Sequence, residues 1–245
     1  MEFVNGVKEK RVLDIREVLE WEYEGKEIRM NGAVHTIRHM GEVAFVILRK
    51  SRGLVQCVYE AGITDFDIRE LKEESAVEVM GVVKAEERAP QGFEIRLKEI
   101  RVLSRPAEPL PLAVSKWKLN TSLETKLSLR PISLRNVRER AKFKIQEGIV
   151  RGFRDYLLSR DFTEIRTPKI VARGGGSNVF KLEYFNKKAE LGQSPQFYKQ
   201  TMVGVYDRVF EAAPVFRAEK HNTTRHLNEY TSLDFEMGIS TASGT

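Results

Sequence analysis

Polar side chains with complementary chemistry recur at regular spacing in one stretch near the end of the chain, between Arg208 and Gly238. At the two-residue period of a β-strand, this stretch contains two runs whose polar faces carry Glu211, Arg217, Glu219, Tyr230 and Asp234. A guanidinium matches the fork geometry of a phosphate, a carboxylate can accept from an adenine amino group, and a tyrosine ring can stack on the base. If the two polar faces coincide, the stretch could bind a nucleotide. An ordinary antiparallel sheet with one solvated face would show the same alternation, so spacing alone leaves both interpretations open.

A second candidate group lies just upstream, in the segment QSPQFYKQ at 193–200. Ser194 and Pro195 are suited to be the N-cap and the first position of a helix. Gln196 and Lys199 then lie three residues apart on one helix face. A lysine in an enclosed site would pair with a carboxylate, whereas a solvated helix face would carry the same residue types.

The elements that would hold these groups alternate between strand and helix. The polar stretch predicts a long antiparallel hairpin with a polar loop at 220–228. Upstream, an apolar stripe predicts a helix from Val137 to a break at 159–161, with Ile145, Ile149, Phe153, Tyr156 and Leu157 on one face. A strand with the sequence FTEIRTP follows and ends at Pro168.

The first part of the chain has a different residue pattern. Between residues 26 and 104, five short alternating runs are separated by glycine and charged residues, with a helical segment, DFDIRELKEE, between the third and the fourth. This order predicts an OB-fold barrel, a fold that binds single-stranded nucleic acid with an aromatic platform and basic side chains. A barrel that acts only as a spacer is the alternative. The proline-rich RPAEPLPL then marks a hinge and predicts three parts: 1–104, 105–135 and 136–245.

The composition is that of a soluble protein. Of 245 residues, 41% are apolar and 31% charged, and the net charge of +6 permits a polyanionic partner. No apolar run approaches a membrane span and the N-terminus lacks a signal-peptide pattern, so we expect a cytoplasmic location and no membrane partner. Cys57 is the only cysteine, which excludes an intrachain disulfide, and its apolar neighbours predict that it is buried.

The hairpin stretch resembles motif 2 of the class II aminoacyl-tRNA synthetases, in the form found in archaeal-type aspartyl-tRNA synthetases. The resemblance is carried by Phe-Arg-Ala-Glu at 216–219 and Arg-His-Leu-Asn-Glu at 225–229. It implies that Arg217 is the catalytic residue, placed on the α-phosphate of ATP and on the aspartate carboxylate. Glu219 would bind the adenine amino group and Tyr230 would lie under the ring. The remaining ATP contacts would be Ala218, Arg225, His226 and Leu227.

The segment QSPQFYKQ resembles the aspartate-specific form of the motif that binds the amino acid. The resemblance implies that Lys199 binds the side-chain carboxylate of L-aspartate and that Asp234 faces its ammonium group. Gln193, Gln196 and Arg217 would complete the aspartate site. Asparagine-specific relatives carry a different residue where Lys199 stands. The helix and strand before Pro168 resemble motif 1, which implies a homodimer through this region.

The predicted barrel resembles the anticodon-binding domain of aspartyl-, asparaginyl- and lysyl-tRNA synthetases. The matching residues are Arg38, Phe45, Leu48, Arg49, Gly53 and Gln56. The resemblance implies that Phe45 stacks on the central anticodon base, Gln56 reads its edge and Arg38 touches the loop. Ala33 and Lys50 depart from the family, which has tryptophan and aspartate there.

His35 and Pro90 bear on which tRNA is accepted. Both are of the type found in relaxed enzymes, which charge tRNA-Asp and tRNA-Asn alike, so the resemblance implies a non-discriminating enzyme. A strand-surface histidine and an ordinary turn proline would look the same.

Two features depart further from the family. The loop before Gly175 lacks the glutamate that, in the family, closes over the amino acid. The chain also ends in GISTASGT directly after motif 2, without motif 3 and the acidic ligands for Mg²⁺ that the family places downstream. We therefore expect no metal ligands in this chain, and we expect that the 245 residues alone do not make aspartyl-adenylate.

The sequence thus predicts a mixed α/β protein of the α+β type: an OB-fold barrel, then the first part of an antiparallel class II sheet with flanking helices. The function implied by the resemblance is that of a ligase that activates L-aspartate with ATP and Mg²⁺ and transfers it to tRNA-Asp and tRNA-Asn. Two alternatives stay open: an inactive protein that only binds tRNA, and an asparaginyl-tRNA synthetase.

Overall fold

The computed structural model describes residues 12–20, 22–174, 176, 178–221, 223 and 226–238. The chain divides into two compact units, Met1–Ala141 and Lys142–Thr245. The predicted hinge at 105–135 lies within the first unit.

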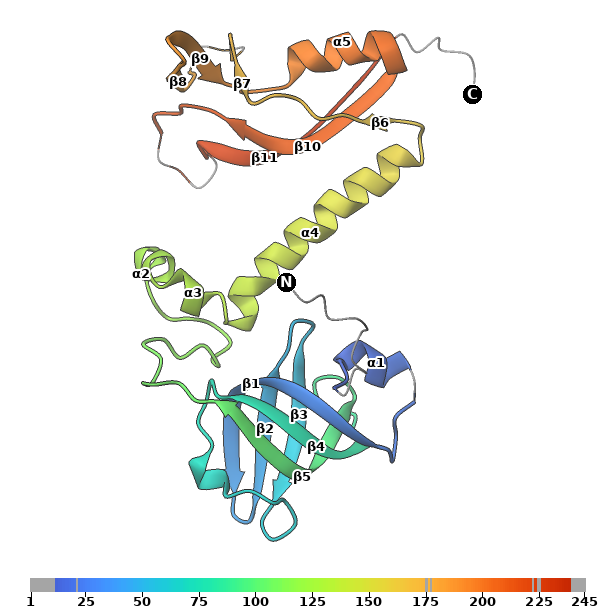
Figure 1. Ribbon diagram of the computed structural model, residues 1–245, viewed down its shortest axis with the longest axis vertical. Helices are drawn as coiled ribbons and strands as arrows, with labels where there is room; N and C mark the ends of the chain where they lie inside the picture. The colour runs from blue at the N-terminus through green and yellow to red at the C-terminus, as the bar shows by residue number, and fades with distance from the viewer. Residues whose placement is uncertain are drawn as a thin grey trace, which may run out of the picture. The chain divides into compact units, whose positions relative to one another are not determined.

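The first unit is built on a closed barrel whose strands neighbour one another in the order β1-β2-β3-β5-β4 (Figure 1). Its strands are β1 (Glu27–Met40), β2 (Val43–Arg49), β3 (Leu54–Glu60), β4 (Ala76–Ala85) and β5 (Phe93–Ser104). A helix, α1 (Ile15–Glu20), precedes the barrel. The helical segment expected after β3 is only one 3₁₀ turn, η1 (Ile68–Glu70), because Asp67 caps it and the backbone is already extended at Leu71.

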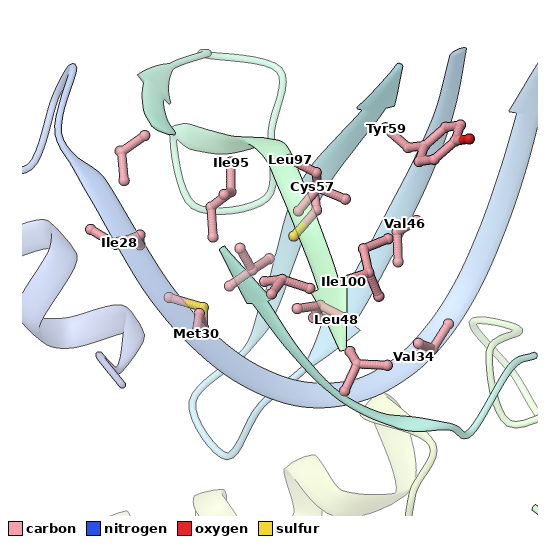
Figure 2. Packing of buried hydrophobic residues seen from close by; sticks show 14 of the residues in the cluster. Ile28, Met30, Val34, Val46, Leu48, Cys57, Tyr59, Ile95, Leu97 and Ile100 are labelled. Carbon is pink, nitrogen blue, oxygen red and sulfur yellow. The ribbon is translucent and has the colours of Figure 1, made fainter. Parts of the chain in front are cut away.

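The barrel is filled by alternate side chains of its strands, as Figure 2 shows for Met30, Leu48, Cys57 and Ile95. Cys57 is buried in this core, as its apolar neighbours predict, and burial raises the pKa of its thiol. The residues between the core positions point outward, so that β2 and β3 present a second face of the sheet, at the surface of the barrel.

The hinge region contains two short helices, α2 (Leu123–Ser128) and α3 (Arg130–Ser133), before the long helix α4 (Val137–Leu158). Its prolines predicted irregular structure, but Pro131 sits in the first turn of α3, where its missing N–H leaves no hydrogen bond unmade. Asn136 begins α4 by accepting from the backbone N–H groups of Arg138 and Glu139, at 3.0 and 3.2 Å.

The second unit contains a three-stranded sheet in the order β11-β10-β6. The strands are β6 (Thr163–Glu164), β10 (Arg208–Phe216) and β11 (Glu229–Met237), and β10 and β11 form the predicted antiparallel hairpin. A second small sheet consists of β7 (Ile170–Val171), β8 (Lys181–Tyr184) and β9 (Lys187–Leu191). Helix α5 (Gln196–Tyr206) connects β9 to β10 and contacts both strands of the hairpin.

The apolar stripe of α4 is only partly covered. Phe153 meets Phe210 edge-on at a ring-centroid distance of 5.7 Å, and Leu157 is buried. Ile145, Ile149 and Tyr156, which the helical period placed on the same stripe, are exposed. The stripe therefore packs on the sheet at its C-terminal end.

Candidate functional site

The register of the hairpin brings the predicted polar residues to one face. Glu211 pairs with Asp234, Ala213 with Ser232, and Val215 with Tyr230. Side chains that are directly opposite in an antiparallel pair share a face, so the two polar faces do coincide. The opposite face carries Phe210 and Phe235, which contact aromatic rings of α4 and of the loop after it.

Lys199 reaches this polar face from α5. Its side chain is 6% exposed, and its ammonium lies 3.1 Å from Asp234 Oδ1 and 3.5 Å from Glu236 Oε2. Gln196 donates to Glu236 at 3.3 Å, so both predicted helix residues face the sheet. The helix begins with Pro195 as its N-cap, one residue later than expected, and no side chain caps it. Three of the predicted aspartate-binding residues are thus brought together.

The predicted nucleotide residues line one cavity of about 300 Å³, formed by Arg217, Glu219, His226, Leu227 and Tyr230. The Arg217 guanidinium lies 5.8 Å from the centre of the Tyr230 ring. The Arg217 backbone N–H donates to the Asn228 carbonyl at 2.9 Å, which continues the hairpin beyond Phe216. Arg225 lies outside the described residues.

The glycine-rich segment before β8 is fixed to this hairpin. The Ala218 backbone N–H donates to the Asn178 carbonyl at 2.9 Å, and the Gln193 side-chain amide donates to the same carbonyl. A Cβ atom at Gly176 would lie 1.9 Å from the Gln193 amide oxygen, so the Gln193 side chain packs directly against this glycine. Gln193 therefore contacts the loop in which the family's lid glutamate is missing. Gly175, in the same loop, lies outside the described residues.

Glu211 is a site residue to which the sequence interpretation gave no role. Its buried carboxylate accepts from the Thr167 backbone N–H at 2.8 Å, from the Thr167 hydroxyl at 2.7 Å and from the Lys169 ammonium at 2.9 Å. It thereby fixes the segment around Pro168 to β10. Its place on the polar face of the predicted strand was the available signal.

The outer face of the barrel gathers the predicted anticodon residues. Arg38, Phe45, Val58 and Arg96 are paired in one row across β1, β2, β3 and β5. Gln56 lies in the adjacent row, paired with Glu94 of β5.

Glu94 was missed by the sequence interpretation. Its buried carboxylate accepts from Gln56 Nε2 at 2.9 Å and forms an ion pair with Arg96 at 2.8 Å. The Gln56 amide is therefore held in one orientation, with its amide nitrogen directed at Glu94. Alternation alone gave no signal, because it places Glu94 on an exposed face of its strand.

His35 and Pro90 lie near opposite ends of β4, and their effect on the choice of tRNA stays a prediction. His35 neighbours Ser75 at the start of β4, because Val34 N–H donates to the Ser75 carbonyl at 2.8 Å. Pro90 is in the turn after β4 ends at Ala85. Gln91, the residue after Pro90, has its side-chain amide against Gly53, in the turn that follows Arg49.

His35 is buried, so the alternative interpretation of it as a strand-surface residue is wrong. It is the extra residue of a β-bulge between Val34 and Thr36, and it is only 4% exposed. Its Nδ1 lies 3.3 Å from Arg49, which in turn pairs with Glu74 at 2.5 Å. Burial, and then the charge of Arg49, lower the pKa of His35 below its usual 6.5.

No three His, Cys, Asp or Glu side chains gather to hold a metal ion among the residues that the structure describes. In the same residues, no helix is long and apolar enough to cross a membrane.

Comparison with known proteins identifies the class of protein. Residues 122–244 match the family described as tRNA synthetases class II (D, K and N), and residues 28–103 match the OB-fold nucleic acid binding domain. The chain belongs to the class II tRNA synthetases of this group. The predicted barrel and class II fold are confirmed.

The similar proteins include aspartate–tRNA ligases and an asparaginyl-tRNA synthetase. The chain is 48% identical to the Aspartate--tRNA(Asp/Asn) ligase of Deinococcus radiodurans, covering 89% of this chain and 49% of the relative. It is 46% identical to the ligase of the same name from Thermus thermophilus, covering 88% of this chain and 50% of that relative. The crystal structure of asparaginyl-tRNA synthetase from Pyrococcus horikoshii, complexed with asparaginyl-adenylate, has a TM-score of 0.77 at 34% identity and covers 88% of this chain and 50% of that one. The chain spans about half the length of these relatives.

The buried ion pair predicts an effect on stability. Replacing Lys199 by Met leaves Asp234 and Glu236 without their cation, so Lys199→Met should lower the free energy of unfolding by about 2–4 kcal/mol at pH 7. Adding Asp234→Asn should recover most of the lost stability, because it removes an uncompensated carboxylate. Urea unfolding measures both. A double variant no more stable than Lys199→Met would contradict the assignment.

The bulge histidine predicts a pH effect with a definite sign. Because the pKa of His35 is lower in the folded chain, the unfolded chain binds more protons below about pH 6.5, and stability should fall from pH 7.5 to pH 5. His35→Gln should flatten this fall when unfolding is measured across the range. Glu74 does not interfere: burial alone would raise its pKa, but Arg49 and Arg135 lower it below 4.5. His39→Gln, at an exposed position of the same strand, is the control, and an equal effect there would refute the role of His35.

Proposed function

We propose that this chain is part of an aspartate–tRNA ligase, which joins L-aspartate to tRNA through an aspartyl-adenylate. The observation that carries the proposal is the shared face of the hairpin. On it, a buried lysine among carboxylates lies beside a cavity that is lined by an arginine, a glutamate and a tyrosine. That pairing of groups suits an amino acid joined to an adenosine phosphate.

The adenylate step needs no side-chain nucleophile. An oxygen of the aspartate α-carboxylate attacks the α-phosphorus of ATP, the bond to the β-phosphate oxygen breaks, and pyrophosphate leaves. The terminal adenosine hydroxyl of tRNA then attacks the activated carbonyl, and AMP leaves. Arg217 contributes by binding the α-phosphate and the carboxylate, so that the reacting atoms are held together and developing charge is stabilised.

Tyr230 and Glu219 are suited to the adenine end. Both line the cavity beside Arg217, where a ring can stack on a base and a carboxylate can accept from its amino group. His226 and Leu227 lie on the same cavity and would meet the triphosphate side. Mg²⁺ would accompany the triphosphate, and we assign it no ligand among the described residues.

Charge determines which amino acid the site selects. In the ligand-free site Lys199 is already neutralised by Asp234 and Glu236. A bound aspartate would bring both a carboxylate for Lys199 and an ammonium for Asp234, so each group would exchange one ionic partner for another. Asparagine would satisfy Asp234 but leave Lys199 with a neutral amide, which is the basis for rejecting it.

The barrel face is suited to the anticodon. Phe45 is an outward aromatic ring with Arg38 beside it in the same row, the combination of platform and cation that single-stranded RNA requires. Because Glu94 holds the Gln56 amide nitrogen, Gln56 would present its carbonyl oxygen to a base edge.

We also infer relaxed tRNA choice, a homodimer and a cytoplasmic location. Relaxed choice is supported by relatives named for both tRNAs. The homodimer through the Pro168 region is supported by the exposed apolar side chains Ile145, Ile149 and Tyr156 on α4.

The aspartate site can be tested on this chain with non-hydrolysable adenylate analogues. We expect the aspartyl analogue to bind at least about a hundredfold more tightly than the asparaginyl analogue, measured by calorimetry. Lys199→Met should abolish or reverse that preference.

Thr201→Val, on the same helix but exposed, is the matched control and should keep the preference. An asparaginyl preference in the unchanged chain would favour the asparaginyl alternative, and no binding of either analogue would favour a protein that only binds tRNA.

Relaxed tRNA choice can be tested by binding. Transcripts of tRNA-Asp and tRNA-Asn should bind this chain with dissociation constants within about threefold, and Phe45→Ala should weaken both by about 5- to 150-fold. Leu103→Ala, an exposed apolar position on β5, is the control. A preference for tRNA-Asp above about a hundredfold, or roughly 2.7 kcal/mol, would refute relaxed choice.

A further inference from the structure

Trp117 is an exposed tryptophan on a segment that is firmly held at both ends. Its side chain is 73% exposed. Three residues before it Val114 is buried, and two residues after it Leu119 is buried. Tryptophan is highly buried on average, and its large flat ring is suited to contact with another molecule.

Asn136 fixes the backbone beneath this ring. Its buried side-chain amide donates to the Val114 carbonyl at 3.0 Å and to the Lys116 carbonyl at 2.6 Å. The same residue caps α4, so the segment is tied to the start of a 22-residue helix. Trp117 is therefore presented by an ordered backbone, which lowers the entropy cost of using it as a contact.

The charged residues next to Trp117 in the sequence are both positive. Lys116 and Lys118 flank it and are exposed. The chain contains no acidic residue between Glu108 and Glu124. An aromatic ring between two cations is the arrangement with which proteins bind unpaired nucleotides, since the ring stacks on a base and the cations meet the phosphates.

We propose that Trp117 is a stacking site for an unpaired nucleotide of RNA, with Lys116 and Lys118 on the adjoining phosphates. The site is separate from the row of Arg38 and Phe45 on the barrel strands, and it lies in the same unit. The inference rests on the proposed tRNA-binding function, and it adds a second contact that reads no sequence, because every base has a face on which to stack.

Fluorescence of the chain itself reports on this contact. The chain contains two tryptophans, so Trp21→Phe leaves Trp117 as the only indole. Titration with a tRNA-Asp transcript should quench its emission and protect it from acrylamide at least about threefold. A fully paired RNA duplex and heparin, which offer phosphates or negative charge without an unpaired base, should do neither.

Variants separate stacking from charge. Trp117→Ala should weaken tRNA binding by about 5- to 150-fold without changing the slope of log affinity against log salt. Trp117→Phe should retain most of the affinity. Lys116→Ala and Lys118→Ala should each lower that slope by about 0.7–0.9. Leu123→Ala is the matched control, because Leu123 is 71% exposed in the same region and has no aromatic face.

Several outcomes would overturn the inference. Equal quenching by the paired duplex or by heparin would show a purely electrostatic contact. Emission that depends on protein concentration without RNA would show that a second copy of the chain covers Trp117. Tight tRNA binding that is lost in Phe45→Ala but unchanged in Trp117→Ala would refute the stacking site and leave the proposed function intact, whereas no tRNA binding at all would refute both.

Discussion

Two carboxylates, Glu211 and Asp234, lie directly opposite each other on one face of the β10–β11 hairpin. The Cβ atoms of such a pair lie roughly 5 Å apart, and like charges directly opposite each other are destabilising. Each carboxylate has its own lysine: Lys169 binds Glu211, and Lys199 binds Asp234. The two lysines come from different segments, so the polar face is stable only when both segments are folded against the hairpin.

This constraint connects the loops of the second unit into one arrangement. Lys169 lies in the segment after Pro168, and its carbonyl accepts from the Gly192 N–H at 2.9 Å. The Gly192 carbonyl accepts from the Phe216 N–H at 3.0 Å, next to Arg217. Gly192 also lies just before the helix that carries Lys199. Charge compensation at Glu211 therefore positions the residues of the amino-acid pocket and of the nucleotide cavity at the same time.

The sequence predicts this face well because both determinants are periodic. Alternation in two strands and a three-residue spacing in a helix place Asp234, Tyr230 and Lys199 correctly without any knowledge of the loops. Glu211 lay on the same predicted face, but its partners come from forty residues upstream, and local pattern has no access to such contacts. Glu94 was missed for a related reason, since its burial depends on Gln56 of a strand that is far away in the sequence.

His35 departs from the strand pattern for a different physical reason. A bulge inserts one residue into β1, which interrupts the alternation and turns His35 from the surface toward Arg49. Strand periodicity assumes an unbroken ladder of paired residues, so a single extra residue reverses the predicted side of the strand. The bulge also explains why Arg49, although it faces outward by alternation, is nearly buried: it lies between His35 and Glu74. His35 therefore belongs to a chain of contacts that reaches the hinge, because Arg135 pairs with the same Glu74.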